Sequence, residues 1–392
     1  MTNKISNFIQ VETSAGFTEL AVKEEIPDQY VFDVLERCLQ NKSLQNKSLE
    51  QKKILEVMLG SYDKKLKNIN NFSENDFLLN KNEKYELHNF KDNLLKSERY
   101  LAYRYKYVVY PRLRKIDTYP PCVQIEPASI CNYRCIMCYQ SDSTFSEKKN
   151  NYMGYMSFDL FKKIVDEIEG HVEALTLASR GEPTLNLKFI DFLKYCKNKF
   201  LALKINTNLS TLNENLARAF FENEIQTVVV SADSATKEGY EKIRVKGNFD
   251  KILKNLELLK KIKNEYPESN CSIRVSGVKL SDDQDFELMK DIYGKYCDSI
   301  AFVDYLPWES SYENSVNEIM DPCTDLWKRI FVWYDGKINP CDYDYKSTLS
   351  KHNYNSTSIK ESWNSIYYNE LRSMHLKRDR RLISPCNRCT NT

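Results

Sequence analysis

The chain has 392 residues, of which 42% are hydrophobic, and this is enough for two or three domains with a barrel-sized core. Its formal net charge of +2 creates no overall field that would draw it to nucleic acid or to an anionic membrane. The opening residues hold no apolar stretch of signal-peptide length, and no run approaches the roughly 18 apolar residues of a membrane span. We therefore expect a cytoplasmic globular protein, with neither membrane nor nucleic acid as a partner.

Residues 1–118 are polar, rich in Lys and Asn, and mostly helix-like, so we predict a helical N-terminal domain. Near its end four tyrosines share a helical face and alternate with basic residues; they are Tyr100, Tyr103, Tyr107 and Tyr110. Such a stripe can stack bases and hold phosphates. Packing of the tyrosines on a neighbouring domain is the favoured interpretation.

Six short apolar runs, separated by amphipathic helical patterns, follow between residues 119 and 310. We expect them to be strands, at 122–126, 174–178, 202–206, 227–231, 272–276 and 299–303. Six strand–helix repeats predict an α/β fold, a partial (β/α)6 TIM-like barrel with parallel strands and right-handed crossovers. In such barrels the reactive groups gather at the C-terminal ends of the strands.

A cysteine loop follows the first of these strands, with Cys131, Cys135 and Cys138 inside eight residues. Twelve cysteines in a cytosolic chain indicate metal ligands and reduced thiols rather than disulfides. A four-iron cubane is normally held by four cysteines, so a loop with three leaves one iron open. The alternative is a zinc knuckle that takes its fourth ligand from elsewhere.

The next three strands also end in polar motifs. The second is followed by Arg180-Gly181-Glu182-Pro183, the third ends in Asn206-Thr207-Asn208, and the fourth ends in Ser231-Ala232-Asp233. Because parallel strands present their carboxyl ends at one edge, these segments are expected to meet the cysteine loop at one mouth.

With these motifs, residues 122–392 resemble the radical S-adenosylmethionine (SAM) enzymes. The resemblance implies that SAM chelates the open iron and that one electron cleaves it to methionine and a 5'-deoxyadenosyl radical, which abstracts a hydrogen atom from substrate carbon. It also implies an electron donor such as flavodoxin or ferredoxin. The family more often has glycine where this chain has Arg180.

The same resemblance implies roles for individual residues. Gly181 and Glu182 would bind the SAM amino group, and Ser231 and Arg244 its carboxylate, which an arginine can engage with two parallel hydrogen bonds. The ribose would be reached by Asn206 or Asn208, and the adenine flanked by Met137 and Tyr139.

Residues 311–392 hold a second cysteine cluster, made of Cys323, Cys341, Cys386 and Cys389. Between the first two, Asp335-Gly336 predicts a tight primed turn in a hairpin over 331–338, and a helix-like stretch at 363–376 precedes the last two. The region resembles the SPASM and twitch domains that carry auxiliary 4Fe-4S clusters. Four cysteines predict one fully ligated auxiliary cluster, with structural zinc as the alternative.

Asp342 directly follows Cys341. The segment resembles that of anaerobic sulfatase-maturating enzymes, which place a catalytic base at this position. Burial would raise the pKa of such a carboxyl group toward the working pH. The other interpretation is an exposed turn aspartate.

Taken together, the resemblance implies a radical SAM oxidoreductase that dehydrogenates a secondary alcohol of a small polar metabolite, such as a sugar or an aminocyclitol. One alternative is an epimerase, which would need a hydrogen-donor thiol in the barrel, for example Cys271 or Cys297. Another is modification of a ribosomally made peptide, which a winged-helix N-terminal domain would favour. The hypothesis from a different class is a zinc-stabilised RNA-binding protein.

Overall fold

The computed structural model describes residues 9–11, 17–21, 25–41, 48–281 and 284–391. The first eight residues, where the sequence suggests no signal peptide, lie outside this range. Among the described residues no helix is both long and apolar enough to span a membrane.

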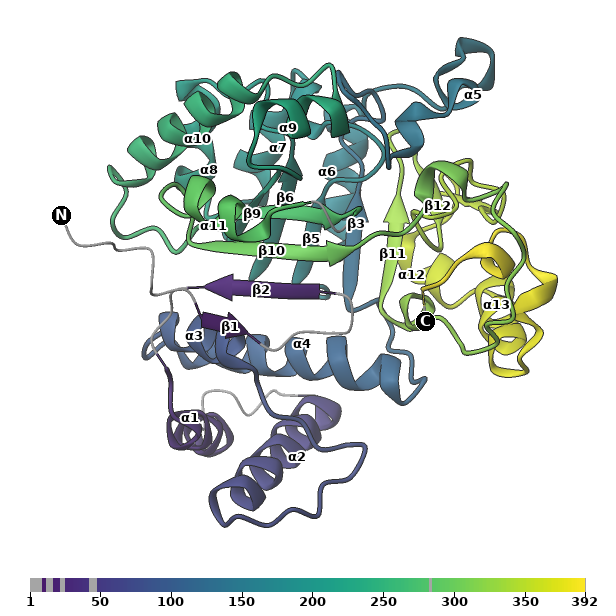
Figure 1. The fold of residues 1–392 in the computed structure, drawn as a ribbon. Coiled ribbons are helices and arrows are strands. Elements are labelled where there is room, and N and C mark those ends of the chain that lie inside the picture. Colours follow the sequence, from purple (N-terminus) through teal and green to yellow (C-terminus); the bar gives the residue numbers. More distant parts are fainter. Residues whose placement is uncertain (1–8, 12–16, 22–24, 42–47, 282–283, 392) are drawn as a thin grey trace.

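Six parallel strands form the centre of one sheet (Figure 1). They are β3 (Cys122–Ile125), β5 (Ala174–Leu177), β6 (Ala202–Thr207), β7 (Thr227–Ser231), β9 (Ser272–Lys279) and β10 (Ser299–Asp304). Neighbours in this order pair in parallel. The predicted strands and the α/β partial barrel are therefore confirmed.

Helices cover the outer face of this sheet. They are α6 (Phe158–Ile168), α7 (Phe189–Cys196), α8 (Glu214–Glu222), α9 (Lys237–Ile243), α10 (Phe249–Lys263) and α11 (Phe286–Tyr293). The side chain of Ser157 accepts a hydrogen bond from the Leu160 N–H and so caps α6. In β6, Leu203 and Ile205 are buried in the core under the helices. Since side chains alternate along a strand, Lys204 and Asn206 face the inside of the barrel.

Both edges of the parallel sheet are extended by other parts of the chain. On one edge β2 (Phe17–Ala21) pairs antiparallel with β10, and β1 (Ile9–Val11) pairs with β2. On the other edge β11 (Arg329–Val332) runs parallel to β3 and is followed by β12 (Lys337–Asn339) and β13 (His352–Asn353). The C-terminal region thus continues the barrel sheet. The N-terminal strands were not predicted from the sequence.

The N-terminal helices are α1 (Asp28–Gln40), α2 (Leu49–Leu66), α3 (Lys81–Asn89) and α4 (Leu94–Arg112). Helix α4 packs across the N-terminal ends of the barrel strands, where Tyr100 and Tyr103 share a buried cluster with Cys122 and Ala174. The tyrosine stripe therefore packs against the neighbouring domain, as favoured above.

The hairpin between β11 and β12 is present, but its turn differs from the prediction. Gly336 has a φ of +84°, whereas Asp335 is not among the residues with positive φ. The Gly336 N–H donates to the Trp333 carbonyl at 2.9 Å. This is the pattern of a type I turn followed by a left-handed glycine, not of a primed turn. The helical stretch predicted at 363–376 corresponds to α13 (Ile366–Leu376), and its first residue ends a separate short helix, α12 (Ile359–Trp363).

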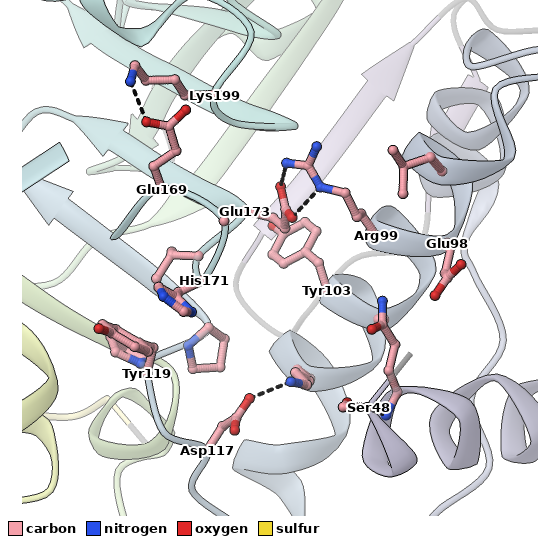
Figure 2. Close-up of a pocket in the computed structure, with 18 of the residues that line it drawn as sticks. Ser48, Glu98, Arg99, Tyr103, Asp117, Tyr119, Glu169, His171, Glu173 and Lys199 are labelled. Atoms are coloured by element: carbon pink, nitrogen blue, oxygen red, sulfur yellow. Dashed lines mark hydrogen bonds and ion pairs between the residues drawn. The ribbon is translucent and has the colours of Figure 1, made fainter. Parts of the chain in front are cut away.

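A pocket of about 650 Å³ lies between α4 and the loops that precede β3, β5 and β6 (Figure 2). In it Arg99 makes two hydrogen bonds of 2.7 Å to Glu173, and the rings of Tyr119 and His171 stack at 4.6 Å. The pocket is at the N-terminal ends of the strands, opposite to the end that carries the cysteine loop. Its position separates it from the candidate active site.

Candidate active site

The cysteine loop is anchored by a short two-stranded ribbon. Strand β4 (Arg134–Cys135) pairs antiparallel with β8 (Arg244–Val245), which sets Cys135 opposite Arg244. Arg244 Nη1 donates to Cys135 Sγ at 3.7 Å, and its Nη2 lies 2.7 Å from Asp233 Oδ2. The predicted Arg244 therefore lies at the loop. Its buried ion-pair partner, Asp233, was missed as a functional residue, because only the three-dimensional pairing reveals it.

The three thiols of the loop lie close to one another and are partly or fully buried. Burial, followed by the nearby Glu182 carboxylate, raises the pKa of Cys131 to about 12. Burial also raises the pKa of Cys138, with further contributions from Cys135 and Cys131. The thiols are thus close enough to influence one another, and binding of metal would replace their protons. This donor set fits a cluster held by three cysteines.

Gly181 and Glu182 contact the backbone of residues 128–130, which leads into the cysteine loop. A Cβ atom on Gly181 would lie 2.4 Å from the Ala128 carbonyl oxygen and 2.5 Å from that of Ile130, so only glycine permits this approach. The Glu182 N–H donates to Ile130 O at 2.9 Å. Gly181 therefore positions the segment against the cysteine loop.

The buried Glu182 carboxylate is held by several donors. Thr184 Oγ1 and Thr207 Oγ1 donate to its Oε1 at 2.5 and 2.7 Å, and the Asn208 N–H donates to its Oε2 at 2.7 Å. Burial raises the pKa of Glu182, and these hydrogen bonds oppose that effect. Since each carboxylate oxygen has two lone pairs, Oε2 retains capacity for one more donor, as an amino group would supply.

Two predicted ribose ligands have different surroundings. The Oδ1 atom of Asn206, on the inner face of β6, is buried without a hydrogen-bond partner among the described residues. A buried acceptor of this kind fits a hydroxyl donor such as a ribose supplies. Asn208 Nδ2 instead donates to Asn132 Oδ1 at 3.0 Å and to Cys131 Sγ at 3.9 Å, and so holds the loop. Ser231, at the end of β7, is half-buried.

Tyr139 connects the loop to the C-terminal region. Its ring is buried and stacks with Tyr345 at 5.0 Å and with Trp308 at 6.0 Å between centroids. Its hydroxyl donates to Ser179 O at 2.7 Å. These contacts make Tyr139 part of the protein core beside the site, and Met137 remains half-buried within the loop.

The four C-terminal cysteines also come together. Burial, followed by Asp325 and Cys389, raises the pKa of Cys323 to about 12. Burial raises the pKa of Cys341, and Asp342 and the three other cysteines add to the effect. Four thiols that are mutual neighbours fit a fully ligated cluster. The thiols are nevertheless not arranged around a single metal ion. Among the described residues no group of three or more His, Cys, Asp or Glu side chains is close enough to hold one.

Asp342 is half-buried and is not an exposed turn residue. Burial raises its pKa to about 6, against the opposing effects of Arg329 and of a hydrogen bond with Gln124. Gln124 lies on the inner face of β3, so this hydrogen bond places the Asp342 carboxyl group beside the barrel interior. Burial raises the pKa of Tyr139, and the charges of Cys138 and Asp342 add to the effect.

Two cysteines considered as hydrogen donors lie elsewhere. Cys271 and Cys297 are buried in the core between sheet and helices, and each precedes the N-terminal end of a strand. They are thus remote from the strand ends that form the mouth, and neither is placed to be the hydrogen-donor thiol that an epimerase would need.

Comparisons with known proteins agree with this geometry. Residues 125–292 match the model of the radical SAM superfamily, and residues 323–390 match SPASM, an iron-sulfur cluster-binding domain. A cysteine-type anaerobic sulfatase-maturating enzyme of Clostridium novyi is 32% identical over 235 residues, which cover 54% of this chain and 60% of that protein. The mycofactocin maturase MftC of Mycobacterium ulcerans is 26% identical over 175 residues, 45% of each chain.

Among solved structures, Streptococcus suis SuiB bound to S-adenosylmethionine superposes with a TM-score of 0.53 at 14% identity. The superposition covers 94% of this chain and 90% of that one, and it shows a shared fold. The chain spans 60% and 45% of the lengths of the two curated relatives named above.

Proposed function

We propose that this chain, which carries a radical SAM domain followed by a SPASM domain, dehydrogenates a secondary alcohol of a small polar substrate. Its cofactors are SAM and two 4Fe-4S clusters. When bound, they supply the abstraction of a hydrogen atom from carbon and an acceptor for one electron. The domain limits 1–118, 119–310 and 311–392, a cytoplasmic location and a flavodoxin- or ferredoxin-like electron donor belong to the same proposal.

The chain's own residues bind and orient. Cys131, Cys135 and Cys138 would hold the first cluster, and the four C-terminal cysteines the second. Glu182 would receive the SAM amino group through its free lone pair, and Asn206 would accept from a ribose hydroxyl. Arg244, fixed by Asp233, would face the SAM carboxylate together with Ser231.

The position of Asp342 carries the proposal. Its carboxyl group lies beside Gln124 on the inner face of the barrel and one residue from Cys341. Dehydrogenation removes a hydrogen atom from the substrate carbon, a proton from the hydroxyl group and one further electron. Asp342 would take the proton. Cys341 and its three partners would hold the acceptor of the electron, and a carbonyl product results.

The test uses the reconstituted full chain with SAM and a reductant, supplied with secondary alcohols that carry deuterium on the carbinol carbon. Deuterium in 5'-deoxyadenosine and a trapped carbonyl product, both measured by mass spectrometry, are the expected results. Asp342→Asn should keep deuterium transfer and lose carbonyl formation, whereas Asp335→Asn, in the hairpin turn, should retain both. Deuterium transfer with equal carbonyl formation in Asp342→Asn would exclude the proposed base.

Modification of a peptide is the second candidate, favoured by one structural observation. Strands β1 and β2 give residues 1–118 a mixed character, closer to the strand-and-helix composition that a peptide-binding module would have. Two relatives, a sulfatase-maturating enzyme and a mycofactocin maturase, are also named for the maturation of other molecules. The same deuterium assay with labelled peptides separates the two candidates.

A further inference from the structure

The inner face of the barrel carries two cations on neighbouring levels. Lys204 on β6 is in register with Thr176 on β5 and Thr227 on β7. Two residues further along β6, toward the mouth, Asn206 is in register with Val229 on β7. Val229 is in turn in register with Arg274 on β9. Side chains in register on parallel strands point to the same face of the sheet, so Lys204 and Arg274 both face inward. Along the strand direction they are two residues apart, which is about 7 Å.

The charge of Lys204 is not balanced by a nearby carboxylate among the described residues. The side chain is half-buried, and its ammonium group makes no hydrogen bond or ion pair with any residue that the structure describes. Burial lowers its pKa to about 8, with further lowering by Arg274 and Arg329 and opposing effects of Cys122 and Asp342. The positive charge of Lys204 therefore costs free energy in the folded chain.

Other buried cations of the site differ in this respect. Arg244 pairs with Asp233 at 2.7 Å, and Arg180 pairs with Glu126 at 2.7 Å. Arg329, at the floor of the barrel, lies 3.1 Å from Asp325 and donates to Tyr107 Oη at 3.3 Å. Each of these charges is matched by a carboxylate of the chain, whereas the ammonium of Lys204 has none within ion-pair distance.

We infer that the inner face of the barrel binds an oxyanion of the substrate, a carboxylate or a phosphate group, between Lys204 and Arg274. An ammonium and a guanidinium on adjacent levels suit such a group, because both donate charge-assisted hydrogen bonds to its oxygens. The bound oxyanion would place the rest of the substrate beside Gln124 and Asp342. The inference rests on the proposed function in that this mouth receives the substrate.

Binding of simple oxyanions to the reconstituted full chain tests the inference. Inorganic phosphate and malonate serve as probes in titrations followed by thermal unfolding, and KCl keeps the ionic strength constant. We expect both probes or one of them to stabilise the native chain, and a preference identifies the phosphate or the carboxylate. Lys204→Met should raise the apparent dissociation constant roughly tenfold or more, the usual effect of losing one hydrogen bond to a charged group.

Three further variants make the result specific. Arg274→Met should weaken binding in the same way, Lys204→Arg should retain it, and Lys254→Met, on the exposed side of α10, should leave it unchanged. The inference fails if neither probe stabilises the native chain beyond KCl, or if Lys204→Met and Arg274→Met bind as tightly as the native chain. Because probe binding requires neither an electron donor nor turnover, this failure would leave the dehydrogenase proposal to its own test.

Discussion

Arg180 and Glu126 form a buried ion pair in which two nitrogens of the guanidinium, Nε and Nη2, each lie 2.7 Å from a carboxylate oxygen. The third nitrogen, Nη1, donates to Tyr345 O at 2.8 Å, and the guanidinium lies 4.3 Å over the ring of Trp333. Arg180 thus joins the ends of two barrel strands to the C-terminal region. This explains structurally why a large cation is accommodated where the family more often has glycine.

Replacing Arg180 by Met should destabilise the chain by about 3–5 kcal/mol, because the Glu126 carboxylate would remain buried without its partner. Urea unfolding of the two proteins measures the difference. Arg218→Met, which removes solvent-exposed pairs with Glu214 on α8 and with Glu265, should cost less than about 2 kcal/mol, since an exposed pair contributes about 1 kcal/mol at most. Equal losses in the free energy of unfolding of the two variants would show that the buried pair stabilises the chain no more than the exposed pairs do.

Local sequence patterns were sufficient for the strands and the cysteine motifs. Each barrel strand is a short apolar run that separates two amphipathic helical patterns, and this contrast located it. Strands β1 and β2 lacked such a signal, because they are defined by pairing with the edge of the sheet at β10. The same distinction holds in the site. The resemblance to a family signature suggested Arg244, whereas its ion-pair partner Asp233 and the inward position of Lys204 depend on how distant segments of the chain come together.

The two cysteine sets should hold separate clusters. After anaerobic reconstitution we expect about eight irons per native chain and about four in a Cys131→Ala/Cys135→Ala/Cys138→Ala variant, given four irons per cubane. Labile sulfide should fall in parallel. Four irons in the native chain and none in the variant would mean that the C-terminal cysteines hold no cluster, and the electron-accepting step would be lost.

Gly181 should be required for assembly of the cysteine loop. In Gly181→Ala the new Cβ would meet the Ala128 carbonyl oxygen at 2.4 Å, and backbone atoms cannot move aside as flexible side chains do. We expect lower stability, by about 1–3 kcal/mol as for an overpacked site, and a lower iron content of the first cluster.

Gly60→Ala is the matched control for this change. Gly60 lies within α2, and a Cβ there has no atom within 4 Å. Alanine should stabilise the helix by up to about 1 kcal/mol and leave the iron content unchanged. If Gly181→Ala reconstituted as fully as Gly60→Ala, the close approach of Gly181 to the loop would not matter for cluster binding.

Lys204 should lower the stability of the chain at neutral pH. Its pKa is about 8 in the folded chain and about 10.4 when unfolded, so the unfolded chain binds more protons between these values. The loss of stability caused by charged Lys204 is at its full value below pH 8, and it disappears as the pH rises toward 10.4. Since the side chain is half-buried, Lys204→Met should stabilise the chain at pH 7 by about 1–3 kcal/mol, less than the full pKa difference implies.

The gain in stability should be smaller at pH 10, and the control Lys254→Met should show neither the gain nor its pH dependence. A loss of stability at pH 7 in Lys204→Met would mean that the ammonium group of Lys204 is stabilised by the folded chain itself, and a basis for the oxyanion site would be gone.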